Sequence, residues 1–281
     1  MAQIQLDLSE VNQILENALR EDIGSGDITT NLLFPYDAEC RAIILAKEEG
    51  LVAGLPIAEM VFRKLDKDIV WSEEKKDGDK VEPNQVMAEI SGTQKSVLTG
   101  ERVALNFLQR LSGIATLTSR FVKAIHGLPV KILDTRKTAP GLRILDKYAV
   151  RVGGGFNHRF GLYDEVLVKD NHIKLAGGIT RTINILRERA VTQKRIEVEA
   201  STISEVEEAL NVGADVILLD NMPPKMIIYA VGLIKGKALI EVSGRVTLEN
   251  VREIAETGVD FISVGSVTHS SRALDIGLYV V

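Results

Sequence analysis

The sequence predicts an α/β protein: an incomplete parallel α/β barrel of about six strands, joined to an N-terminal α+β sandwich domain. After Pro129, six short apolar runs alternate with amphipathic helical patterns, as is typical of a parallel sheet covered by helices. Before that point, strand-like runs occur without this alternation. No G-x-G-x-x-G follows the first apolar run, so we favour a barrel over an open dinucleotide-binding sheet.

Length and composition limit the possible classes of protein. A chain of 281 residues permits one or two domains, and we assign residues 1–112 to the N-terminal domain and 113–270 to the barrel. Residues 271–281 are expected to pack back on the first domain. The formal net charge of −5 argues against a broad nucleic-acid surface. One cysteine, no signal-peptide pattern and no apolar run of membrane-spanning length predict a cytoplasmic protein without a membrane partner.

The first domain is expected to mix helices and strands. Apolar residues repeat at helical spacing in two places and in short continuous runs in four others. We expect helices at residues 10–21 and 56–65, and strands at residues 39–47, 51–53, 68–73 and 85–90.

Residues 95–126 carry a long helical pattern, because apolar side chains recur every three or four positions. Gly100 and Gly113 lie within it, and a glycine inside a helix costs about 1 kcal/mol. We therefore predict two helices here. Arg102 and Arg110 lie in the same stretch, where spacing alone predicts only solvation or pairing with a nearby acid.

The barrel domain is expected to contain six β-α units. Its strands are predicted at residues 130–133, 165–168, 195–199, 216–219, 238–242 and 261–264. Its helices are predicted at residues 142–152, 179–190, 203–211, 224–234 and 248–256.

Every predicted barrel strand ends in polar, charged or glycine residues, and ligands of parallel α/β folds bind at the carboxyl ends of the strands. Turn chemistry explains any one of these ends, but six together indicate a site. They are Asp134-Thr135-Arg136-Lys137, Lys169-Asp170-Asn171-His172, Glu197 with Glu199, Asp220-Asn221, Ser243-Gly244-Arg245 and Gly265-Ser266.

The residue types at these ends indicate an anionic ligand. Arg136, Lys137, Arg159 and Lys169 suit carboxylates or a diphosphate, because cations form strong hydrogen bonds with both. His158 is open between a proton donor, a hydrogen-bonding contact and a structural residue.

Two further features concern the phosphorylated part of the ligand. Glu199 and Asp220 suit ribose hydroxyls or a magnesium ion, directly or through substrate or water. Ser-Gly and Gly-Ser at the last two strand ends offer N–H groups and hydroxyls to a phosphate. The residues alone therefore predict a barrel enzyme for a phosphorylated, multiply anionic substrate, with Mg²⁺.

Several motifs, in order along nearly the whole chain, resemble the quinolinate phosphoribosyltransferase family. The combination is far more specific than any single motif. The motifs are EDIGSGDITT at 21–30, GERVALN at 100–106, LSGIAT at 111–116, DTRKT at 134–138, GGGFNHR at 153–159, KDNH at 169–172 and LLDN at 218–221.

The resemblance implies transfer of a phosphoribosyl group from phosphoribosyl pyrophosphate (PRPP) to quinolinate with decarboxylation, giving nicotinate mononucleotide, pyrophosphate and CO₂ in NAD biosynthesis. It also implies a homodimer, or a higher oligomer, in which Arg102 reaches the partner's site. Catalytic roles fall to Lys169, Arg136, Glu199 and Asp220. The substrate-binding set is Arg102, Thr135, Arg136, Lys137, His158, Arg159, Lys169, Glu199, Asp220, Ser243, Gly244, Arg245, Val264, Gly265 and Ser266.

Within this set the resemblance implies separate subsites. Quinolinate carboxylates would be held by Arg136, His158, Arg159 and Lys169, and PRPP phosphates by Lys137. The ribose and the metal-bound diphosphate would contact Glu199 and Asp220, and the 5′-phosphate would lie at Ser243, Gly244, Gly265 and Ser266.

Two residues depart from the family pattern, and two other functions remain as alternatives. Arg245 stands where glycine or asparagine is usual, and Ser266 stands where alanine is usual; both lie at the expected phosphate end. One alternative is a lyase that forms a Schiff base on Lys169. The other is a non-catalytic relative associated with molybdenum transport, against which the full set of cations argues.

Overall fold

The structure is a computed structural model that describes residues 7–189 and 194–281. The last residue of the helix expected at 179–190 lies outside these ranges. The chain forms two compact units. The first contains the residues up to Ser119, together with Thr138–Gly154 and Ser266–Val281; the second contains Arg120–Lys137 and Gly155–Gly265. The single boundary between residues 112 and 113 stays a prediction.

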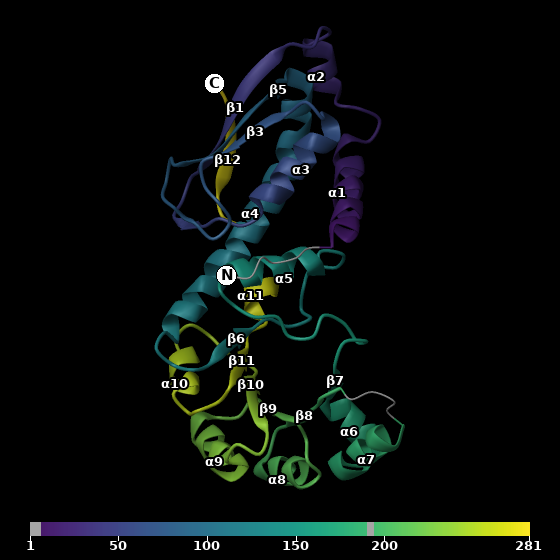
Figure 1. Cartoon of the computed structure of the whole chain (residues 1–281), viewed down its shortest axis with the longest axis vertical. Helices are drawn as coiled ribbons and strands as arrows, with labels where there is room; N and C mark the ends of the chain where they lie inside the picture. The colour runs from purple at the N-terminus through teal and green to yellow at the C-terminus, as the bar shows by residue number, and fades with distance from the viewer. Residues whose placement is uncertain (1–6, 190–193) are drawn as a thin grey trace. The chain divides into compact units, whose positions relative to one another are not determined.

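The first unit is built on an antiparallel sheet with the strand order β12-β1-β5-β3. The last strand of the chain lies beside the first, with Ala42 opposite Val280 and Ala46 opposite Ile276. The strands are β1 (Glu39–Ala46), β3 (Val70–Glu73), β5 (Val86–Thr93) and β12 (Ile276–Val280), with a separate pair, β2 (Gly50–Leu51) and β4 (Lys80–Val81). The helices are α1 (Leu8–Ile23), α2 (Ile28–Leu33), α3 (Leu55–Leu65), α4 (Gln94–Ala124), α5 (Arg143–Val152) and α11 (Ser266–His269) (Figure 1).

The prediction of two helices between residues 95 and 126 is wrong, because α4 is one helix of 31 residues. Both glycines inside it are sites of close packing. A Cβ on Gly100 would lie 2.8 Å from the ring of Phe62, and one on Gly113 would lie 2.1 Å from the carbonyl oxygen of Arg272. Close packing at these points offsets the low helix propensity of glycine.

The second unit contains a six-stranded parallel sheet with the order β6-β11-β10-β9-β8-β7. The strands follow the chain around the sheet, and the first strand lies beside the last, as in a barrel. No pairing joins β6 to β7 within the described residues, so the predicted incomplete barrel of six strands is confirmed. The strands are β6 (Lys131–Leu133), β7 (Val166–Val168), β8 (Ile196–Ala200), β9 (Val216–Asp220), β10 (Leu239–Ser243) and β11 (Phe261–Ser263).

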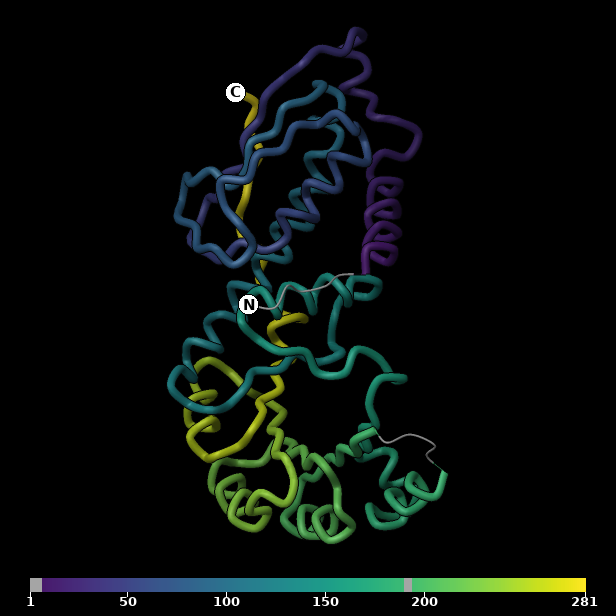
Figure 2. Tube along the Cα trace, in the orientation of Figure 1, coloured from purple at the N-terminus to yellow at the C-terminus, as the bar shows by residue number. Residues whose placement is uncertain are grey.

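Helices cover one face of this sheet, as the chain trace also shows (Figures 1 and 2). They connect consecutive parallel strands, with α6 and α7 together lying between β7 and β8. Their apolar sides are buried, including Val206 and Ala209 of α8 and Ile227 and Ala230 of α9. The helices are α6 (Asp170–Ala176), α7 (Ile179–Arg189), α8 (Ile203–Asn211), α9 (Pro224–Ile234) and α10 (Val251–Ala255).

The opening between β6 and β7 has a clear origin in the chain path. The helix that follows β6, α5, belongs to the first unit, so it does not return the chain directly to a neighbouring strand. The chain then comes back at Phe156, whose N–H donates to the carbonyl of Ile132 at 2.8 Å. Asp134 in turn donates its N–H to the carbonyl of Phe156 at 3.0 Å. The segment after Phe156 is thereby placed at the carboxyl end of β6.

Within the described residues, no helix combines the length and the apolar character needed to cross a membrane.

Candidate functional site

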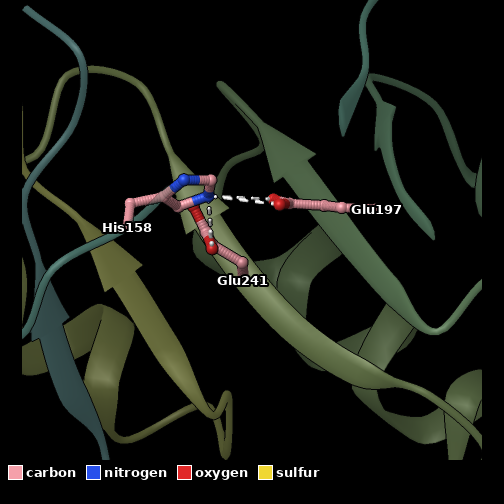
Figure 3. Close-up of side chains that lie close together, drawn as sticks. All are labelled: His158, Glu197 and Glu241. Atoms are coloured by element: carbon pink, nitrogen blue, oxygen red, sulfur yellow. Dashed lines mark hydrogen bonds and ion pairs between the residues drawn. The ribbon is translucent and has the colours of Figure 1, made fainter. Parts of the chain in front are cut away.

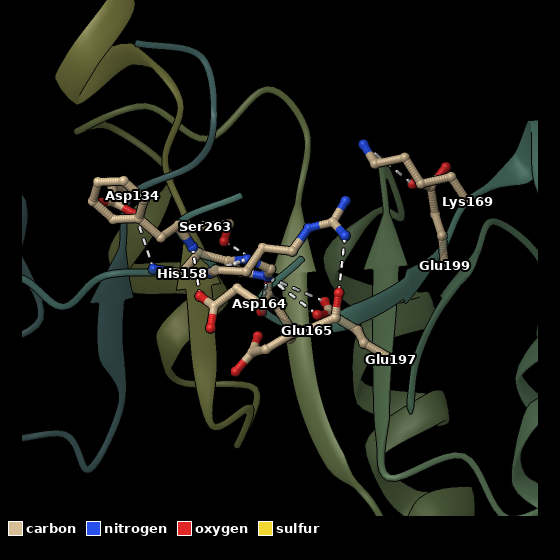
Figure 4. Close-up of polar contacts among 11 residues, drawn as sticks. Asp134, His158, Asp164, Glu165, Lys169, Glu197, Glu199 and Ser263 are labelled. Carbon is tan, nitrogen blue, oxygen red and sulfur yellow. Dashed lines mark hydrogen bonds and ion pairs between the residues drawn. The ribbon is translucent and has the colours of Figure 1, made fainter. Parts of the chain in front are cut away.

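The carboxyl ends of the parallel strands bring most of the predicted site residues into one unit. Figure 4 shows three of them, His158, Lys169 and Glu199. Lys169 directly follows β7, Glu199 lies in β8, and Asp220 and Ser243 end β9 and β10. Arg102 and Ser266 belong to the first unit, where Arg102 lies exposed on α4 and Ser266 begins α11. The other members in the second unit are Thr135, Arg136, Lys137, His158, Arg159, Gly244, Arg245, Val264 and Gly265.

Asp134 fixes the segment that carries His158. Its carboxylate is fully buried and accepts from the side-chain amide of Asn157 at 2.6 Å and from the backbone N–H of His158 at 2.8 Å. A buried carboxylate held by such donors is a rigid anchor, because leaving either donor unpaired is costly. The position of His158 therefore depends on the strand end and not on a free loop.

The His158 ring lies between two buried glutamates, one on β8 and one on β10 (Figure 3). Its Nε2 is 3.1 Å from Oε2 of Glu197 and 3.4 Å from Oε2 of Glu241. Glu241 also accepts a 2.5 Å hydrogen bond from the hydroxyl of Ser263. Burial alone would lower the pKa of His158, but the hydrogen bonds and charges of the two carboxylates raise it. The backbone N–H of Arg159 opposes this rise, because it faces Nδ1 at 2.8 Å and leaves no room for a second ring proton. We call His158, Glu197, Glu241 and Ser263 the histidine cluster.

The histidine cluster contains the one described group of His and acidic side chains close enough together to hold a metal ion. The backbone N–H of Arg159, however, donates to Nδ1 of His158 at 2.8 Å. A metal on Nε2 would require the ring proton on Nδ1, where it would face this N–H. The geometry therefore puts the ring proton on Nε2, between the carboxylates, and leaves no lone pair there for a metal.

Arg159 is a buried cation with no carboxylate partner. Its residue is 6% exposed, and its guanidinium donates to the backbone carbonyl of Glu165 at 3.1 Å. Within the described part of the chain, no acidic side chain lies at ion-pair distance from it. Burial, followed by the charge of nearby Arg136, lowers the pKa of Arg159, while the more distant charges of acidic side chains, Glu197 first among them, act in the opposite direction. An arginine stays protonated throughout. Two close cations, one of them buried, make a site for an anion with more than one negative group.

Lys169 and Glu199 form the opposite side of the site. Their charged atoms are 4.0 Å apart, and the Lys169 side chain is half exposed. Burial, and then the negative charge of Asp220, raises the pKa of Glu199. The backbone N–H of Lys169 donates to Nδ1 of His172 at 3.0 Å, which fixes the start of α6. Lys169, Glu199 and Asp220 thus offer a cation and two carboxylates at three adjacent strand ends.

Asp220 is held by two donors. The hydroxyl of Ser243 donates to Oδ1 at 2.7 Å and the amide of Asn221 donates to Oδ2 at 2.6 Å. The two residues after Ser243 adopt a left-handed backbone conformation, with φ of 90° at Gly244 and 52° at Arg245. The Ser243 hydroxyl thus faces a carboxylate in this structure, so the backbone beyond it is the part of this strand end that suits a phosphate.

The remaining predicted residues lie at the first and last strand ends. The Thr135 hydroxyl accepts the backbone N–H of Lys137 at 3.0 Å, and Lys137 itself is exposed. Val264 is buried and donates its N–H to the carbonyl of Leu133 at 2.9 Å. Gly265 follows directly and is half-buried.

Family comparisons agree with the order of these features along the chain. Residues 27–112 match the N-terminal domain, and residues 114–279 the C-terminal domain, of quinolinate phosphoribosyl transferase. The chain belongs to the quinolinate phosphoribosyltransferase family.

Named relatives of this family are similar over almost the whole chain. A probable nicotinate-nucleotide pyrophosphorylase (carboxylating) of Bacillus subtilis is 45% identical, with 96% of this chain and 93% of the relative covered. A decarboxylating quinolinate phosphoribosyltransferase of Nicotiana tabacum is 44% identical, with coverages of 96% and 82%. The solved structure of the Francisella tularensis nicotinate-nucleotide pyrophosphorylase superposes with a TM-score of 0.93 at 42% identity, covering 99% and 98% of the two chains.

Part of the histidine cluster carries no motif that marks it as a site. Glu197 was noted only as a polar residue at a strand end, and Glu241 and Ser263 were not singled out at all. The available signal is an acidic residue inside a buried apolar strand, as in Leu-Ile-Glu-Val at 239–242. Such a residue is almost never fully buried without a partner.

Proposed function

We propose that the chain transfers the phosphoribosyl group of PRPP to quinolinate and releases CO₂, yielding nicotinate mononucleotide and pyrophosphate in NAD biosynthesis. The observation that carries this proposal is the buried Arg159, which lacks a carboxylate partner and lies near the charge of Arg136. A dianionic pyridine dicarboxylate supplies a negative group at contact distance from Arg159, and a second one beside it. Family membership supports the same reaction.

The quinolinate subsite is formed by Arg136, Arg159 and Lys169. A guanidinium can hold a carboxylate through two parallel hydrogen bonds, which fixes the plane of the pyridine ring as well as its position. Holding the ring in one orientation directs its nitrogen at the reacting carbon of the ribose. Lys169 supplies a half-exposed charge on the opposite side, beside Glu199.

The PRPP subsite uses the other strand ends. We assign Lys137 to the phosphates; its backbone N–H donates to the Thr135 hydroxyl. Glu199 and Asp220 face the ribose, and they are the residues that would hold Mg²⁺, directly or through substrate or water. Two carboxylates at adjacent strand ends are a donor set that Mg²⁺ accepts, and when bound the ion would neutralise diphosphate charge.

The phosphate end of the substrate is assigned to the last two strands. Ser243, Gly244 and Arg245 leave β10, and Val264, Gly265 and Ser266 lead from β11 into α11. Backbone N–H groups and an exposed cation suit the 5′-phosphate at this end of a barrel.

The chemistry has two steps. The pyridine nitrogen attacks C1′ of the ribose while the bond from C1′ to the diphosphate oxygen breaks, and the bonding electrons leave with pyrophosphate. Positive charge on the ribose in this step is stabilised by Glu199 and Asp220. The bond between C2 and its carboxylate then breaks, CO₂ departs, and the electron pair left on C2 takes up a proton. The adjacent pyridinium nitrogen stabilises that pair, so Arg136 and Lys169 need only orient the carboxylate.

We further propose a homodimer, or a higher oligomer, in which Arg102 completes the site of the partner subunit. Arg102 is exposed on α4, and its side chain makes no ion pair or hydrogen bond among the residues that the structure describes. The proposed compartment is the cytoplasm, since the single cysteine suits a reducing environment.

The two alternatives receive less support. A Schiff-base lysine needs burial or cationic neighbours to lower its pKa, but Lys169 is half exposed and lies beside the carboxylate of Glu199. A non-catalytic transport-associated relative does not require the complete set of cations and carboxylates found at these strand ends.

The test is incubation of the purified protein with PRPP, Mg²⁺ and either quinolinate or nicotinate. We expect nicotinate mononucleotide to form in the mixture with quinolinate and not in the mixture with nicotinate. Turnover with nicotinate but not with quinolinate would show that nicotinate is the acceptor of the phosphoribosyl group. Borohydride trapping of a carbonyl substrate on Lys169 would instead support the lyase.

A further inference from the structure

Both ring nitrogens of His158 are engaged by the protein itself. Nε2 lies 3.1 Å and 3.4 Å from the carboxylates of Glu197 and Glu241, and Nδ1 accepts the backbone N–H of Arg159 at 2.8 Å (Figure 3). The His158 side chain is 9% exposed. A ring used in this way has no polar atom left for a substrate carboxylate.

We propose that the histidine cluster positions Arg159, and that His158 does not itself contact quinolinate. The two carboxylates hold the ring through Nε2–H, and Nδ1 holds the backbone of Arg159. This inference rests on the proposed function, because it assigns Arg159 to the quinolinate carboxylates. It gives Glu197 and Glu241 a role as positioning residues.

The strands that carry the cluster residues support this role. Glu197 and Glu241 lie on β8 and β10, the two neighbours of β9 in the sheet, so the sheet sets their separation. Ser263 of β11 fixes the Glu241 carboxylate, and Asp134 fixes the backbone N–H of His158. Three strands and the residue that follows β6 thus determine where the ring lies.

The cost of burying the cluster also points to a function. Two glutamates and a histidine inside a sheet are no more stabilising than well-packed apolar side chains of the same size. A chain that needed only a filled sheet interior could use leucine or isoleucine at these places. The cluster also contacts Arg159 directly, because the backbone N–H of Arg159 donates to Nδ1 of His158.

The first test observes the ring directly. Long-range ¹H–¹⁵N spectra of the four histidine rings are recorded, with His158 identified by the signals lost in His158→Asn. We expect a bare Nδ1 and a protonated Nε2, without quinolinate and with saturating quinolinate. A proton that arrives at Nδ1, or leaves Nε2, when quinolinate binds would make His158 a direct ligand and overturn the proposal. Loss of the Nε2 proton on addition of Zn²⁺ would make the cluster a metal site, with the same consequence.

The second test is kinetic. Glu241→Ala removes one carboxylate, and we expect the KM for quinolinate to rise roughly tenfold or more, because a small misplacement of a binding group has effects of this size. The KM for PRPP should stay unchanged. Glu241→Gln keeps an oxygen for Nε2–H and should stay within about threefold of the wild type, as a neutral acceptor is weaker than a charged one but still present.

Control variants separate positioning from general damage. Glu256→Ala removes an exposed carboxylate that pairs with Arg252 rather than with the cluster, and it should leave the KM for quinolinate unchanged. Equal losses in Glu241→Gln and Glu241→Ala, or a loss confined to PRPP binding, would contradict the proposal. If Glu241→Ala does not fold, the Gln variant and the ring spectra still decide. If the wild type makes no nicotinate mononucleotide, the proposed function fails, whereas the ligand-free ring spectrum still reports on the cluster.

Discussion

Arg159 is the single residue on which the proposed anion site depends most. A buried charge without an opposite charge is costly, and binding of a dianion removes that cost. We expect Arg159→Ala to lower kcat/KM for quinolinate about 100-fold, since a hydrogen bond to a charged group contributes about 1.5–3 kcal/mol. Arg159→Lys should recover part of the loss, because it keeps the charge but not the planar pair of donors.

Steady-state kinetics with each substrate varied in turn would check this prediction. Arg195→Ala is the matched control, because Arg195 is exposed and lies just before β8, at the opposite end of the sheet. An Arg159→Ala enzyme with wild-type kcat/KM for quinolinate would remove this residue from the site.

Side-chain partners distant in sequence are the part of the structure that local spacing could not show. Spacing predicted only solvation or a nearby acid for Arg110, yet its guanidinium makes two hydrogen bonds, of 2.8 and 2.7 Å, with the fully buried Asp146, 36 residues further along the chain. Asp146 also accepts the N–H of Ala139 at 3.0 Å. A pairing of this kind depends on how the elements pack, which local spacing does not contain.

At the scale of elements, Gly244 determines the turn after β10. Its φ is 90°, and a Cβ there would lie 2.3 Å from the side-chain oxygen of Asn221. We expect Gly244→Ala to lower the free energy of unfolding by at least about 1–2 kcal/mol from the left-handed backbone alone. It should also raise the KM for PRPP, which steady-state kinetics measures. An unchanged KM for PRPP would place the 5′-phosphate elsewhere.

Two helical glycines give opposite predictions. Gly113→Ala brings a Cβ to 2.1 Å from the Arg272 carbonyl, whereas Gly232 in α9 has no atom within 4 Å of the added Cβ. Gly232→Ala should therefore raise the free energy of unfolding by about 0.5–1 kcal/mol, the ordinary gain of alanine over glycine in a helix. Gly113→Ala should lower it. Urea unfolding of both variants tests the comparison, and a stabilised Gly113→Ala protein would contradict the close packing of α4.

Asp27 gives α2 a stability that depends on pH. Its carboxylate accepts the N–H of Thr30 at 2.9 Å and the Thr30 hydroxyl at 2.6 Å, and these bonds lower the pKa of Asp27 below 3.8. A lowered pKa means that the stabilisation is present above pH 3.8 and is lost as the pH falls through the folded-state pKa. Asp27→Ala should cost about 1 kcal/mol at pH 7, as for other helix caps.

Thermal or urea unfolding of the wild type, Asp27→Ala and Asp27→Asn between pH 2 and 7 measures this effect. Asp27→Asn keeps an acceptor but does not titrate, so the difference from the wild type should shrink at the acid end. A difference that grows on acidification would reverse the sign of the argument.

The parallel strands were predictable because each is a short apolar run followed by polar residues. All six predicted strands agree with the structure to within about one residue at either end. The helices α2 and α6 were not predicted, since both are short and rich in residues that also favour turns. Glu241 was missed for a related reason: its neighbours on β10 describe a buried strand, and the partners that make an acid acceptable there come from β11 and from the segment after Phe156.

At the scale of the whole molecule, the proposed dimer predicts complementation. Subunits carrying Arg102→Ala and subunits carrying Lys169→Ala should each be inactive alone, but mixed dimers should regain activity in those sites that receive both wild-type residues. The measurement is the rate of nicotinate mononucleotide formation after the two variants are mixed and allowed to exchange subunits. Mixed dimers as inactive as their parents would show that Arg102 does not act across an interface.

The central claim is that these strand ends join a ribosyl group to quinolinate and remove its C2 carboxylate. The most direct measurement uses quinolinate labelled at that carboxyl carbon and follows labelled CO₂ in the presence and absence of PRPP. We predict one CO₂ per nicotinate mononucleotide, and none without PRPP, because the pyridinium nitrogen that stabilises the departing electron pair exists only after transfer. Release of CO₂ without PRPP, or a nucleotide product that keeps the label, would contradict this account.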